Sequence, residues 1–77
     1  MLENIESLIS GEGSIEIGRI GPVRCAAVAS DENQMLAALV RRKGESLMYL
    51  MQRLDEAIEK AWEKEIYTDE INSASRR

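Results

Sequence analysis

The sequence predicts an α+β domain, in which a three-stranded antiparallel β-meander is followed by one long C-terminal helix packed on one face of the sheet. Residues 43–66 carry apolar side chains at helical spacing, with no proline and no glycine after Gly44. Residues 14–40 hold three short apolar stretches separated by glycine, proline, aspartate and asparagine. A single helix cannot bury its own apolar stripe, so we expect this one to lie on the strands.

Length and composition leave room for one small domain. The chain has 77 residues, which we divide into an N-terminal arm or short helix (1–13), a β-β-β-α domain (14–67) and a flexible polar tail (68–77). A domain of this size is marginally stable alone. Cys25 is the only cysteine and histidine is absent, so we expect no internal disulfide, metal or cofactor. Tight packing or a second subunit must then supply the stability.

The first residues leave two readings open. Leu2, Ile5, Leu8 and Ile9 fall near one helical face, but eight residues do not separate a short helix from an apolar arm. The glycines of "GEGS" end the pattern.

Three strands follow. "SIEIG" alternates apolar and charged residues, and the glycines and proline of "GRIGP" predict a turn. "VRCAAVAS" (23–30) and "MLAALVRR" (35–42) flank the polar turn "DENQ", in which Asp31 can bond the backbone. Strict alternation places Met35, Ala37 and Leu39 on one face of the third strand.

The long helix begins with Ser46 as its N-cap. Its predicted buried stripe consists of Leu47, Leu50, Met51, Leu54, Ala57, Ile58, Ala61 and Trp62. Glu65 returns to the middle of this stripe, so docking should end near Trp62 or Ile66.

The strands carry apolar residues on both faces, whereas one helix covers only one. The third strand should also have an open edge, which favours pairing with another chain. We therefore expect a homodimer, or another protein partner, bound through Met48, Met51, Trp62 and Ile66. The N-terminal arm is the intramolecular alternative for covering this surface.

The middle of the chain is basic. Residues 18–44 hold five basic residues against two acidic ones, although the whole chain has a net charge of −4. Arg41, Arg42 and Lys43 precede a helix N-terminus and are the candidate anion contacts. The alternative function is a nucleic-acid-binding regulator that uses residues 19–44. We do not expect nucleic acid as the partner, because the strands hold no aromatic residue to stack a base.

No catalytic set converges. Cys25 lacks a histidine base and is expected to be a small buried core thiol. The adjacent acidic pairs Asp31-Glu32, Asp55-Glu56 and Asp69-Glu70 are expected to be solvated surface charges. We therefore expect no enzyme activity.

The order of two strands, Gly44-x-Ser46-Leu47 and a helix over about residues 22–62 is similar to that of small antitoxin domains of the HicB type, but their Pro-and-Gly strand-end motif is missing. The likeness implies, by analogy, a regulatory or interaction module of a bacterial or phage accessory system. The sequence holds neither a membrane-length apolar run nor a basic leader, so we expect a cytoplasmic protein.

Overall fold

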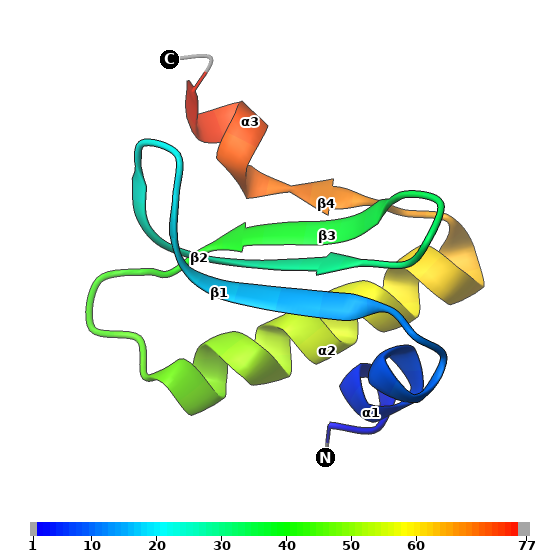
Figure 1. Ribbon diagram of the computed structural model, residues 1–77. Helices are drawn as coiled ribbons and strands as arrows, with labels where there is room; N and C mark the ends of the chain where they lie inside the picture. The colour runs from blue at the N-terminus through cyan, green and yellow to red at the C-terminus, as the bar shows by residue number, and fades with distance from the viewer. Residues whose placement is uncertain (1, 76–77) are drawn as a thin grey trace.

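The computed structural model describes residues 2–75, which form a sheet with a long helix across one face (Figure 1). The elements are α1 (Glu3–Ser10), β1 (Ser14–Ile20), β2 (Val23–Ser30), β3 (Met35–Val40), α2 (Leu47–Lys64), β4 (Thr68–Asp69) and α3 (Glu70–Ser75). The strand order is β1-β2-β3-β4, and β1, β2 and β3 form an antiparallel meander. The predicted α+β architecture is confirmed, together with the short N-terminal helix.

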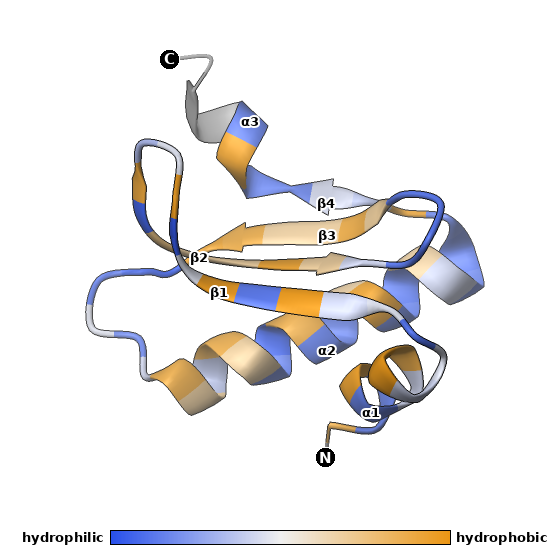
Figure 2. Ribbon diagram, viewed as in Figure 1, coloured by the Kyte–Doolittle hydropathy of each residue, from blue (hydrophilic) through white to orange (hydrophobic). Residues whose placement is uncertain are grey.

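The core is aliphatic, as expected from a sequence without phenylalanine, and it lies between the sheet and α2. Figure 2 shows apolar residues concentrated on the strands and alternating with polar residues along α2. Leu50, Leu54 and Ile58 are fully buried. They pack with alanines and leucines of β2 and β3, and with Ile5 and Leu8 of α1. The N-terminal segment is therefore part of the core.

The ends of α2 match their sequence signals. The Ser46 hydroxyl accepts a 3.1 Å hydrogen bond from the Tyr49 backbone N–H, and Glu65 ends the helix with a left-handed φ of 56°. The predicted buried stripe was too long, because Leu47 and Trp62 are 49% and 44% exposed. Both lie in the terminal turns of α2, outside the part that packs on the strands.

β3 departs from strict alternation. Ala29 pairs with Ala37, but the next residue, Ser30, pairs with Met35, which leaves Leu36 as the extra residue of a β-bulge. The bulge brings Leu36 into the core, where it is 1% exposed, and leaves Met35 36% exposed. The prediction that Met35 shares a face with Ala37 and Leu39 was therefore wrong, because one extra residue reverses the alternation before it.

The expected open edge of β3 is partly closed. β4 pairs with it in parallel, with Ala37 opposite Thr68 and Ala38 opposite Asp69. Just beyond, the Glu70 carboxylate accepts a 2.9 Å hydrogen bond from the Val40 N–H. The segment expected as a flexible tail thus contains a strand and a short helix up to Ser75. The sequence of this segment has no apolar periodicity, so the pattern of residues could not predict the backbone pairing of β4. Residues 76–77 lie outside the described residues.

The sheet face opposite α2 exposes less apolar surface than expected. Cross-strand pairing places Ala26 with Val40 and Val28 with Ala38 on this face. Ala26 and Ala38 are nevertheless 0% and 1% exposed, and α3 packs against β3. This face of the sheet therefore leaves little apolar side-chain surface exposed to solvent.

Candidate functional site

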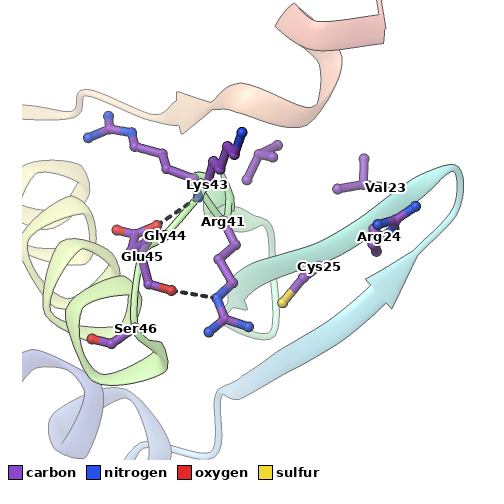
Figure 3. A pocket seen from close by; sticks show the side chains of 10 residues that line it. Val23, Arg24, Cys25, Arg41, Lys43, Gly44, Glu45 and Ser46 are labelled. Carbon is purple, nitrogen blue, oxygen red and sulfur yellow. Dashed lines mark hydrogen bonds between the residues drawn. The ribbon is translucent and has the colours of Figure 1, made fainter.

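A hollow of about 780 Å³ opens where β2 begins and β3 ends. It is lined by Val23, Arg24, Cys25 and residues 40–46. The three predicted anion contacts Arg41, Arg42 and Lys43 all lie here, and Arg24 joins them from β2 (Figure 3). We call this hollow the basic pocket.

A second hollow of about 400 Å³ shares part of this lining. It is bounded by residues 42–46 and by Tyr49, whose side chain is 58% exposed. Tyr49 was not among the predicted site residues, because only aromatic residues within the strands were considered as base-stacking partners. The available signal was local, because Tyr49 lies one helical turn after the cap residue Ser46.

Backbone and side-chain hydrogen bonds fix the loop between β3 and α2. The Arg41 N–H donates to the Cys25 carbonyl at 3.0 Å, which ties the loop to β2. The Arg41 Nε donates to the Glu45 carbonyl at 2.8 Å, and the Glu45 N–H donates to the Arg42 carbonyl at 3.0 Å. Figure 3 shows the Arg41 side chain between this loop and Cys25. The cationic side chains are thus presented on an ordered backbone.

The single acidic residue of the basic pocket, Glu45, is paired with an arginine of α2. Arg53 donates to both of its carboxylate oxygens, from Nε at 2.6 Å and from Nη2 at 2.9 Å. The Arg53 hydrogen bonds, with one from the Arg42 N–H, lower the pKa of Glu45 to about 2. The same pair raises the pKa of Arg53. The Glu45 side chain is only 4% exposed, and its charge is paired chiefly with Arg53 and to a smaller extent with Arg42.

Arg53 also connects α2 with β3 and α3. Its Nη2 donates to the Val40 carbonyl at 3.0 Å, and its Nη1 donates to Glu70 at 3.3 Å. Arg42 lies 4.0 Å from the same Glu70 carboxylate, but its side chain is 65% exposed. Arg42 is therefore weakly held and remains accessible to a ligand.

Cys25 does not belong to the core, contrary to expectation. Its side chain is half-buried and lines the basic pocket beside Arg24 and Arg41. Alternation puts Cys25 on the same face as the buried Ala27 and Ala29, but it lies near the start of β2, where the loop after β3 and not α2 lies beside it.

The acidic residues that the sequence places in adjacent pairs have different surroundings in the structure. Asp55 is 5% exposed and accepts hydrogen bonds from α1, so the expected solvated position was wrong for this residue. Asp31 stays in its turn and accepts from the Asn33 and Gln34 N–H groups at 2.8 Å each, as the sequence predicted.

The four predicted interface residues do not form one surface. Met48, Trp62 and Ile66 are 52%, 44% and 50% exposed, whereas Met51 packs against the core. Met48 and Trp62 are about 21 Å apart along the axis, at 1.5 Å per residue. α1 docks between them, with the Asn4 amide donating to Asp55 at 3.0 Å and to Glu59 at 3.5 Å.

No family model matches the chain, and no curated protein or solved structure is significantly similar to it. Within residues 2–75, none of the helices has the length and apolar character needed to cross a membrane.

Proposed function

We propose that this protein is a small non-enzymatic interaction module that acts as a homodimer, joined through the free edge of β1. The observation that carries the proposal is the position of β1. It is the first strand in the order β1-β2-β3-β4 and, within the described residues, pairs only with β2. Alternate residues of this seven-residue strand therefore point unpaired backbone N–H and C=O groups outward, and another strand can satisfy them.

The apolar cover is also incomplete beside this edge. Ile17 pairs with Ala27, so its side chain points to the same face as α2. α2 packs on β2 and β3, while α1 is the helix that packs on β1. Ile17 is consequently 38% exposed. A second chain at the β1 edge would remove this apolar surface from water, at about 25 cal/mol per Å².

A two-fold axis suits this edge. Two β1 strands can pair antiparallel about an axis perpendicular to the sheet, with Ile17 facing its own copy and both long helices on one side. Such a dimer closes on itself, because the same edge serves both subunits. The dimer uses the β1 edge of each subunit once, so no second β1 edge is left for further strands, and we expect a discrete dimer.

Sedimentation equilibrium tests the proposal. The wild-type protein should behave as a dimer at micromolar concentration, with a melting temperature that rises with protein concentration. Ile17→Lys places a charge on the apolar side of the edge and should give an 8.7 kDa monomer. Ile9→Lys makes the same change at an apolar residue of α1 that is 50% exposed and should leave the dimer intact. A wild-type monomer, or a dimer that tolerates Ile17→Lys, would refute it.

A further inference from the structure

We propose that the basic pocket and the adjoining Tyr49 hollow bind single-stranded nucleic acid, with phosphates on the arginines and lysine and a base on Tyr49. This surface is different from the β1 edge, and the proposed binding does not depend on the dimer.

Charge is the first argument. Arg24, Arg41, Arg42 and Lys43 line the pocket against one acidic residue, Glu45, in a chain whose net charge is −4. Glu45 is held by two hydrogen bonds from Arg53, so it compensates the positive charge of the pocket only in part. A local positive field on an acidic protein selects an anion.

The shape is the second argument. The cations come from two segments, β2 and the loop after β3, and spread over two hollows that share residues 42–46. Arg42 lines both of them and also a third hollow beside Glu70. Several cations distributed over open hollows that share lining residues fit successive phosphates of a strand better than one isolated phosphate.

Tyr49 is the third argument, and it favours nucleic acid over an acidic peptide. Tyr49 is 58% exposed and lines the hollow that Arg42 and Lys43 also line. An exposed aromatic ring beside cations is the arrangement on which bases stack in single-strand binding sites. An acidic peptide would use the cations but would gain little from the ring.

The loop is ordered before any ligand arrives. Its hydrogen bonds to Cys25, and those within residues 41–45, hold the backbone in place. Because less conformational entropy is lost on binding, the cations can contribute more of their interaction to affinity.

Fluorescence anisotropy with short labelled oligothymidylate and oligouridylate tests the inference. We expect binding at low salt with protein at about 100 µM or below, the range of non-specific sites. Affinity should fall as salt rises, with a slope of about 0.7 per phosphate contact. No binding under these conditions would overturn the proposal.

Two matched pairs of variants locate the site. Arg24→Gln with Lys43→Gln removes two pocket cations that make none of the hydrogen bonds described above, and should weaken binding about tenfold or more. Lys64→Gln, in the last turn of α2 and outside both hollows, removes one positive charge as Lys43→Gln alone does, and should weaken binding much less than Lys43→Gln. Tyr49→Leu should cost about fivefold or more, whereas Tyr67→Leu, at a tyrosine that is 44% exposed, should change nothing. Equal losses within either pair would refute the assigned site.

Three competitors separate the sources of the anionic group. An abasic oligonucleotide should bind more weakly than oligothymidylate and should not respond to Tyr49→Leu. Thymidine monophosphate should compete poorly; displacement of the strand by equimolar mononucleotide would show a single-phosphate site instead. A polyglutamate peptide that binds as tightly as the oligonucleotide, with the same dependence on Tyr49, would show an acidic protein partner and overturn the inference.

Discussion

The carboxylate of Asp55, in the middle of α2, accepts a 2.8 Å hydrogen bond from the backbone N–H of Ile5 in α1. Its other oxygen accepts from the Asn4 side chain at 3.0 Å. The first N–H groups of a helix have no partner within the helix, and the residue before α1, Leu2, offers no side-chain cap. Asp55 therefore caps α1 from 50 residues away and holds it over the core.

Replacing Asp55, which caps α1, should lower the stability of the folded protein. Asp55→Ala leaves the Ile5 N–H without its acceptor, so we expect a loss of about 1–3 kcal/mol in the free energy of unfolding. Asp55→Asn keeps one acceptor oxygen but turns an amide toward Asn4, so its loss should be smaller. Urea denaturation measures both losses, and hydrogen exchange should show faster exchange at Ile5. Glu56→Ala, on the exposed neighbour, is the control; an equal effect there would contradict the capping role.

The core under α2 depends on Leu54, which is fully buried. Leu54→Ala should lower the free energy of unfolding by about 2–5 kcal/mol, the usual range for a large-to-small change in a core. Met48→Ala removes a comparable side chain that is 52% exposed and should cost about 0.5 kcal/mol or less. Denaturant titrations of the two variants give the comparison. A loss under about 0.5 kcal/mol for Leu54→Ala would mean that this residue is not central to the core.

The Glu45–Arg53 pair predicts a dependence of stability on pH. The pKa of Glu45 is about 2 in the folded protein and has a reference value of 4.5. Its stabilisation is therefore complete above the reference pKa and is lost as pH falls toward the folded one, because the unfolded chain takes up the proton first.

Urea midpoints measured from about pH 6 down to about pH 2 test this behaviour. Glu45→Gln should be less stable than the wild type at neutral pH, and its stability should fall less over the acidic range. Glu56→Gln removes an exposed carboxylate and should keep the wild-type profile. Parallel profiles for the wild type and Glu45→Gln would show that this carboxylate is not responsible.

Gly13 follows α1 at a point where no side chain fits. A Cβ atom there would meet the Leu8 side chain and would lie 2.8 Å from the Ser30 carbonyl oxygen. Gly13→Ala should therefore cost about 1–3 kcal/mol of folding free energy, as overpacking does. At Gly11 the nearest atom would be the Ser7 carbonyl oxygen at 3.4 Å, so Gly11→Ala should be tolerated. Thermal melts of the pair decide the matter, and equal melting temperatures would refute the close approach.

Sequence alone determined the elements whose signals are local. The apolar spacing of residues 47–64 and the Ser46 cap defined α2, and alternation with turn residues defined the three-stranded meander. The cluster Arg41–Lys43 was also visible as an anion contact, because its charge lies in one run.

The tertiary structure decided everything that rests on contacts between distant residues. The sequence predicts Asp55 to be a surface charge, and only the docking of α1 shows that it is buried. β4 has no apolar periodicity in its sequence, because it is held to β3 by backbone pairing. Arg24 and Cys25 join the loop cations only after β2 and β3 pair. Periodicity records which side of a helix or strand faces the core, but it carries no information about which distant backbone or side chain lies opposite.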